Sequence, residues 1–106
     1  MKIINYRHGD AVRAGCIVGE NVVDLNKAYV QLLKAKGYPR AEQLAAALVP
    51  SNTIELIEGG EKSLEEAYKA ADFALANGMV INRSDVKIEA PVLKPNKIIC
   101  VGHNYR

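Results

Sequence analysis

The chain has few of the features that mark a specialised class of protein. It contains no tryptophan, two cysteines, 8 glycines and 4 prolines among 106 residues. Two cysteines are too few for a small secreted scaffold held by disulfides, and glycine and proline without a fixed period exclude collagen-like or low-complexity chains. The apolar runs span only a few residues, whereas a membrane helix needs about 20. The net charge of +2, from 14 Lys and Arg against 12 Asp and Glu, is too small to indicate nucleic-acid binding.

What is present is typical of a soluble globular domain. Hydrophobic residues make up 49% of the chain and charged residues 25%, and the length predicts one domain with one modest core. No hydrophobic leader segment follows the N-terminus, so we expect a cytoplasmic protein. In that reducing compartment we expect Cys16 and Cys100 to be buried free thiols rather than a disulfide.

The first 25 residues predict β structure. Short apolar segments alternate with turn sequences at 8–10 and 19–21, which is typical of an antiparallel meander. The strands are expected at Met1–Arg7, Val12–Val18 and Val22–Leu25.

The next fifty residues predict helices. Apolar side chains recur at spacings of three and four, and proline or glycine separates the segments. Asp24 or Asn26 is expected to cap the first helix and Ser51 the third. The first three helices are expected at about residues 28–35, 40–48 and 52–58.

The fourth helix has the clearest local signal. Ser63 and Glu66 have the spacing of a capping box, in which the serine hydroxyl and the glutamate carboxylate satisfy the first free amides of a helix. We therefore expect this helix to begin at Ser63 and to end at Asn77–Gly78.

The pattern changes again after residue 79. A short strand is expected at Val86–Glu89, followed by a proline-containing connector, and Lys97–Val101 has the continuous apolar character of a strand covered on both faces. The sequence thus predicts an α+β fold: a small antiparallel sheet with about four helices packed on one side, and an extended C-terminal segment. The compact body is expected to span residues 1–89, and residues 90–106 are expected to extend away from it or to pair with a neighbouring copy.

Residue chemistry alone does not identify a reaction. His8 is expected in a solvated turn, and His103 follows a strand without an identified base or nucleophile as a partner. Gly59–Gly60 lacks the Lys-Ser/Thr of a phosphate-binding loop, and no cysteine or histidine pair has metal-ligand spacing. No catalytic or metal-ligating residue is therefore assigned from composition and spacing.

The end of the chain resembles a known enzyme family. The segment 97–105, Lys-Ile-Ile-Cys-Val-Gly-His-Asn-Tyr, is similar to the opening of the catalytic domain in the fumarylacetoacetate hydrolase family. Val22–Asn26, leading into a helix, and the Ala90–Pro95 linker resemble the small N-terminal domain of that family and its connection. The resemblance extends over essentially the whole chain, with residues 1–89 as the N-terminal domain and 90–106 as the linker and first catalytic strand.

The resemblance implies a function for a longer protein. Members of the family cleave a carbon–carbon bond in β-diketo acids such as acylpyruvates, or isomerise or decarboxylate related enol acids, with Mg²⁺ or Mn²⁺ held by acidic residues. The catalytic histidine of the family falls just beyond Arg106, so this chain alone is expected to be inactive and to bind no metal. Gly102, Asn104 and Tyr105 match the motif and are expected to shape the substrate-binding entry loop, whereas His103 occupies a variable position.

The implied partners are a small keto or enol acid, the protein's own catalytic domain and a second copy in a homodimer, with no nucleic acid and no membrane. An alternative is an autonomous protein-interaction or dimerisation domain without a catalytic role. An open reading frame that continues past Arg106 would distinguish the two.

Overall fold

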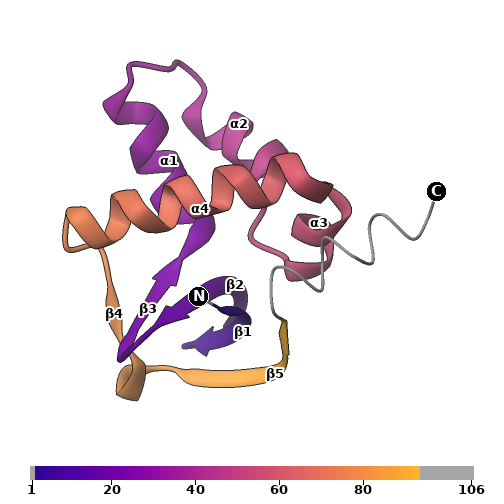
Figure 1. The fold of residues 1–106 in the computed structure, drawn as a ribbon, viewed down its shortest axis with the longest axis vertical. Coiled ribbons are helices and arrows are strands. Elements are labelled where there is room, and N and C mark those ends of the chain that lie inside the picture. The colour runs from indigo at the N-terminus through magenta and orange to yellow at the C-terminus, as the bar shows by residue number, and fades with distance from the viewer. Residues whose placement is uncertain (1, 94–106) are drawn as a thin grey trace.

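The computed structural model describes the backbone of residues 2–93 and the side chains of residues 2–89. Five antiparallel strands form one curled sheet in the order β4-β3-β2-β1-β5 (Figure 1). Two-residue turns join the first three strands, and Gly9 and Gly19 adopt positive φ in these turns, as hairpins of this length require. The strands are β1 Lys2–His8, β2 Ala11–Val18, β3 Asn21–Asp24, β4 Ile81–Asn82 and β5 Lys87–Leu93.

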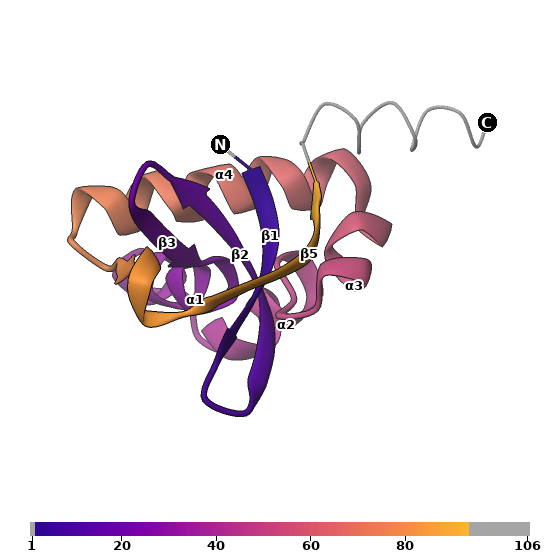
Figure 2. The same ribbon diagram turned by 90° about the horizontal axis from the view of Figure 1, so that it is seen from below.

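The helices lie together on one face of the sheet (Figures 1 and 2). The longest two, α1 and α4, pack against each other, and α3 contacts both β1 and β2. A short 3₁₀ turn at Arg83–Asp85 joins β4 to β5. The helices are α1 Leu25–Ala35, α2 Ala41–Leu48, α3 Thr53–Glu58 and α4 Gly60–Ala76. This arrangement confirms the predicted α+β class with helices on one side.

The core has one part on each face of the sheet. Ile3, Cys16 and Val23 are aligned across β1, β2 and β3 and face the helices. Ile4, Tyr6 and Val22 face the other way and are buried inside the curl of the sheet, together with half-buried side chains from β4 and β5. The alternation follows from the two-residue period of a strand.

The last strand differs from its prediction. β5 runs over Lys87–Leu93, and Val92 and Leu93 pair with Ile4 and Ile3 of β1. Residues 90–93 therefore join the sheet, and the expectation that the chain leaves the body after residue 89 was wrong for these four residues. The register shifts between Ile4 and Asn5, which accommodates the two extra residues Ala90 and Pro91 on an edge strand.

Two predicted helix caps were also wrong. α4 begins at Gly60 with Gly59 as its N-cap, so Ser63 is buried inside the first turns and forms no capping box with Glu66. Asn52 rather than Ser51 caps α3, since its side-chain oxygen accepts hydrogen bonds from the amides of Ile54 and Glu55. Asp24 caps α1 by accepting from the amide of Lys27 at 2.9 Å, which confirms one of the two predicted alternatives.

Candidate functional site

The residues predicted to line an active-site entry lie outside the described part of the chain. Residues 94–106 contain Gly102, Asn104 and Tyr105, and also His103 and Cys100. The role predicted for Gly102, Asn104 and Tyr105 stays a prediction. His8 is exposed at the end of β1. Cys16 is a buried free thiol, as expected, and burial raises its pKa to about 11, so it is unreactive at neutral pH.

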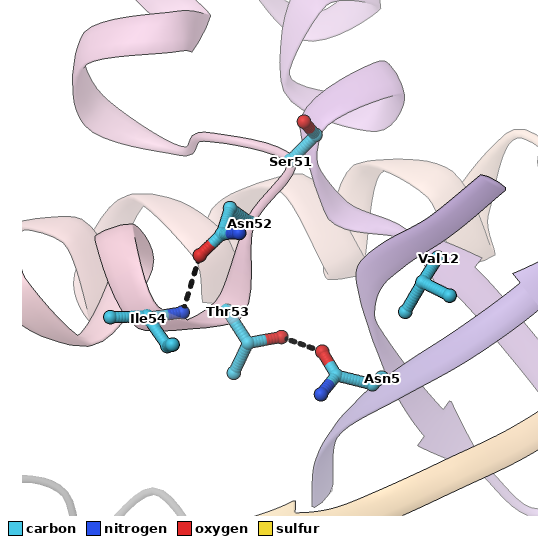
Figure 3. Close-up of a pocket in the computed structure, with 6 residues that line it drawn as sticks. All are labelled: Asn5, Val12, Ser51, Asn52, Thr53 and Ile54. Carbon is cyan, nitrogen blue, oxygen red and sulfur yellow. Dashed lines mark hydrogen bonds between the residues drawn. The ribbon is translucent and has the colours of Figure 1, made fainter.

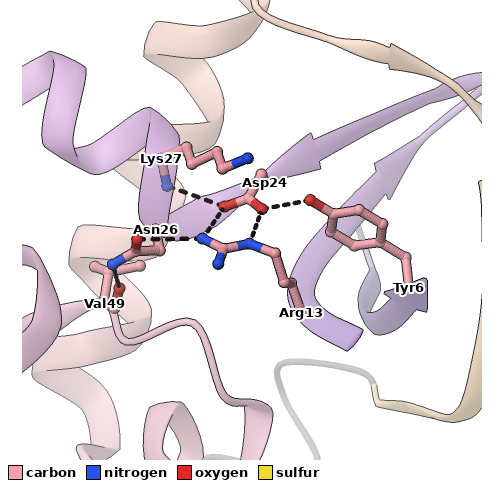
Figure 4. Close-up of polar contacts among 6 residues, drawn as sticks. All are labelled: Tyr6, Arg13, Asp24, Asn26, Lys27 and Val49. Carbon is pink, nitrogen blue, oxygen red and sulfur yellow. Dashed lines mark hydrogen bonds and ion pairs between the residues drawn. The ribbon is translucent and has the colours of Figure 1, made fainter. Parts of the chain in front are cut away.

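A buried polar cluster joins the sheet to the start of α1 (Figure 4). Asp24, the last residue of β3, accepts hydrogen bonds from the hydroxyl of Tyr6 on β1 and from Nε of Arg13 on β2, the latter at 2.5 Å. A second guanidinium nitrogen of Arg13 lies 3.3 Å from both Asp24 Oδ1 and Asn26 Oδ1. Asn26 in turn donates to the carbonyl of Val49 at 2.9 Å. The cluster thus ties three strands, α1 and the loop after α2 together.

The donors around Asp24 fix its charge. Burial disfavours the carboxylate, but Arg13, the Lys27 amide and Tyr6 together outweigh that cost and hold the pKa of Asp24 below its usual value. Burial and the neighbouring carboxylate raise the pKa of Tyr6. Asp24 remains ionised and Tyr6 remains protonated near neutral pH, so neither is suited to exchange protons with a substrate. The cluster therefore has a structural role, in which it links strands to α1.

Strand pairing assembles this cluster, which is why sequence reasoning found only part of it. Gly15 pairs with Asp24, and Tyr6 pairs with Arg13, so all four residues share one face. A side chain at position 15 would stand within 3.0 Å of the Tyr6 ring and of the Val23 carbonyl, which explains the glycine. The signal in the sequence was Asp24 and Asn26 within the Val22–Asn26 motif.

A second polar network joins the two longest helices. Glu66 on α4 accepts a hydrogen bond from the hydroxyl of Tyr29 on α1 at 2.8 Å and pairs with Lys69 at 3.0 Å and Lys62 at 3.4 Å. Burial opposes the charged form of Glu66, but these three donors outweigh burial and lower its pKa to about 2. Glu66, read from the sequence as a cap, therefore clamps α1 to α4.

A shallow pocket of about 160 Å³ lies where α3 meets the first hairpin (Figure 3). Its floor is formed by Asn5 and Thr53, which are hydrogen-bonded to each other. The six lining residues include no histidine, cysteine, lysine, arginine or carboxylate, so the pocket has hydroxyls but no general base to activate one. The lining residues are Asn5, Val12, Ser51, Asn52, Thr53 and Ile54.

The described residues offer no assembled metal or membrane site. Within residues 2–93, no three histidine, cysteine or acidic side chains gather where they could hold a metal ion. In the same part of the chain no helix is long and apolar enough to cross a membrane.

Similarity to known proteins indicates the family of the chain, which the geometry of the described residues does not. The mitochondrial oxaloacetate tautomerase fahd2 of Xenopus laevis is 31% identical over 109 residues, which cover 99% of this chain and 28% of that protein. The oxaloacetate tautomerase YisK of Bacillus subtilis is 32% identical over 93 residues, covering 82% of this chain and 27% of that protein. The mitochondrial oxaloacetate tautomerase FAHD2A of Bos taurus is 39% identical over 57 residues.

No protein-family profile matches the chain. The chain nevertheless aligns with these tautomerases over nearly its whole length, and it spans little more than a quarter of the length of the first two. Together with the motif at residues 97–105, this similarity shows that the chain belongs to the fumarylacetoacetate hydrolase family.

Proposed function

We propose that this chain is the N-terminal part of an enzyme that interconverts the keto and enol forms of a small 2-oxo dicarboxylic acid of the oxaloacetate type. The observation that carries the proposal is the alignment of 99% of the chain with one oxaloacetate tautomerase, supported by 82% coverage with a second. The order of the chain, with the family motif after the folded body, is consistent with an N-terminal position.

Tautomerisation is a proton transfer between carbon and oxygen. It needs a group that removes a proton from the carbon next to the ketone and a group that stabilises the negative charge on the enolate oxygen. None of the buried titratable groups described above suits this task, because Asp24 and Glu66 stay ionised and engaged with several donors each. The catalytic groups are therefore assigned to the part of the protein that follows the described residues.

The family resemblance also implies Mg²⁺ or Mn²⁺ as a cofactor. The residues 2–93 do not fit this role, since they bring no three suitable ligands together. Any metal ligands of the full-length enzyme belong to another part of its chain.

In this proposal the described residues have a positioning role rather than a chemical one. Antiparallel pairing with β1 fixes β5 through Leu93, and β5 leads directly into the segment with the motif. The Asp24 cluster and the Glu66 network join the sheet and the helices into one body, so the position of Leu93 in that body is fixed. The motif residues Gly102, Asn104 and Tyr105 would then enter the catalytic part from a defined point.

The test uses the full-length protein with two substrates. Enol oxaloacetate, followed by its ultraviolet absorbance, should convert to the keto form faster than in buffer, whereas an acylpyruvate should not be cleaved into two acids. Cleavage of the acylpyruvate without tautomerisation would contradict the proposal and favour a carbon–carbon hydrolase of the same family. Loss of neither substrate would favour the alternative of an interaction domain.

A further inference from the structure

Two exposed apolar side chains flank the pocket between α3 and the first hairpin. Val12 is 44% exposed and Ile54 is 68% exposed, and they are two of only four large hydrophobic side chains exposed among the residues whose side chains are described. Scattered single apolar residues are normal on a protein surface. These two differ because they line the same hollow (Figure 3).

The floor between them is polar and is held in place by the fold. Thr53 binds Asn5 of β1, Asn52 caps α3, and the amide of Ala14 donates to the carbonyl of Ser51 at 2.7 Å. The Asn5 amide nitrogen is turned away from Thr53 (Figure 3). The surface is thus preorganised, with two apolar contacts around a hydrogen-bonding group.

The chain leaves the sheet close to this surface. Leu93, the last residue of β5, pairs with Ile3, which lies two residues before Asn5 on β1. At about 3.3 Å per residue and about 4.8 Å between strands, the end of β5 is roughly 8 Å from the pocket floor. The end of β5 and α3 lie side by side in both views of the fold (Figures 1 and 2).

We propose that this surface, formed by Val12, Ile54 and the Asn5–Thr53 floor, is where the catalytic part of the same protein docks. The inference rests on the proposed function, because it requires the part of the relatives that this chain does not span, nearly three quarters of their length. An attached partner that begins beside the pocket is the occupant that this geometry favours.

The size of the surface argues against a separate partner. A stable interface between independent molecules buries at least about 1,000 Å². Two side chains around a small pocket do not reach that area. A covalently linked domain needs much less intrinsic affinity, because a short linker gives an effective concentration on the millimolar scale.

Cysteine labelling tests the docking. Ile54→Cys and the control Tyr38→Cys are each made in the 106-residue chain and in the full-length protein, and maleimide labelling of each site is followed by peptide mass spectrometry. Tyr38 is 49% exposed and lies in the loop between α1 and α2, away from the end of β5 (Figure 1). Val12→Cys repeats the test from the other side of the pocket if Ile54→Cys does not fold.

Labelling at position 54 should be roughly tenfold slower in the full-length protein than in the chain alone, with the control unchanged. Equal rates in both proteins would overturn the docking, as would slow labelling of the chain alone that depends on its concentration, since that result means a second copy. Tautomerase activity is measured separately. Protection without turnover contradicts only the proposed function, and turnover with position 54 unprotected contradicts only the docking.

Discussion

At the scale of single residues, the arrangement depends on two buried carboxylates that are saturated with donors. Asp24 and Glu66 are each less than a tenth exposed. A buried charge is tolerated only when it is paired and hydrogen-bonded, and removing its partners leaves the remaining group without compensation. These two residues therefore matter more to stability than the exposed ion pairs, such as Lys34–Glu42, whose side chains are at least half exposed.

Asp24→Asn should lower the free energy of unfolding by about 3 kcal/mol, because it leaves the Arg13 guanidinium without its ionic partner. Asp72→Asn is the matched control, since Asp72 is exposed on α4, and it should cost less than about 0.5 kcal/mol. Urea unfolding followed by circular dichroism measures both variants. Equal stability of the two would mean that the cluster does not hold the sheet to α1.

The lowered pKa of Glu66 predicts that the stability of the chain depends on pH. The pKa of Glu66 is lowered from 4.5 to about 2, so its contribution to stability is complete above pH 4.5 and is lost as the pH falls toward 2. Glu66→Gln should be less stable than the parent chain at pH 6 and should lose less stability between pH 5 and 3. Glu65→Gln, which changes the exposed neighbouring carboxylate, should keep the parent's pH profile. Parallel profiles for parent and Glu66→Gln would contradict the clamp.

At the scale of helices and strands, most of the correct predictions depend on local contacts. The two hairpin turns, the alternating strands and the Asp24 cap were predicted because each depends on residues within a few positions. The Ser63–Glu66 box failed because α4 begins at Gly60 rather than at Ser63, and Glu66 instead contacts Tyr29, 37 residues away. A contact at that separation has no signature in a local pattern.

The last strand of the sheet was also mispredicted from local sequence patterns. Ala90 and Pro91 were read as a connector, yet an edge strand tolerates a proline whose missing amide needs no partner, and a register shift accommodates the extra residues. Sequence reasoning therefore found the fold class but ended the last strand at residue 89, whereas β5 runs on through Leu93. The site could not be tested in this way, because its predicted residues lie beyond residue 93.

The sequence expectation and the structure place the N-cap of α3 at different residues, Ser51 and Asn52 respectively. Asn52→Ala should cost about 1 kcal/mol of unfolding free energy, since the amides of Ile54 and Glu55 lose their acceptor. Ser51→Ala, at the position first expected to cap this helix, should change stability by less than about 0.5 kcal/mol. Chemical denaturation of both variants decides between them, and a larger loss for Ser51→Ala would restore the original assignment.

At the scale of the whole molecule, the described body should be independent of the motif segment. Deleting Lys97–Arg106 removes none of the strands and helices found within residues 2–93, so the melting temperature should stay nearly unchanged. Ending the chain at Glu89 removes the pairing of Val92 and Leu93 with β1, and this truncation should lower the melting temperature by at least about 5 °C. Thermal melts of the two truncations test this. Unfolding of the longer one would place Lys97–Val101 in the body's own core and favour the autonomous-domain alternative.

The most direct test of the account is the activity of the 106-residue chain by itself. We propose that the catalytic groups lie beyond residue 93. Within residues 2–93 no three histidine, cysteine or acidic side chains gather where they could hold a metal ion, and the neighbouring donors keep Asp24 and Glu66 ionised. With oxaloacetate or acylpyruvates and either Mg²⁺ or Mn²⁺, the chain should convert substrate no faster than buffer, while the full-length protein is active under the same conditions. Metal-dependent turnover by the chain alone that persists after repurification would contradict the account.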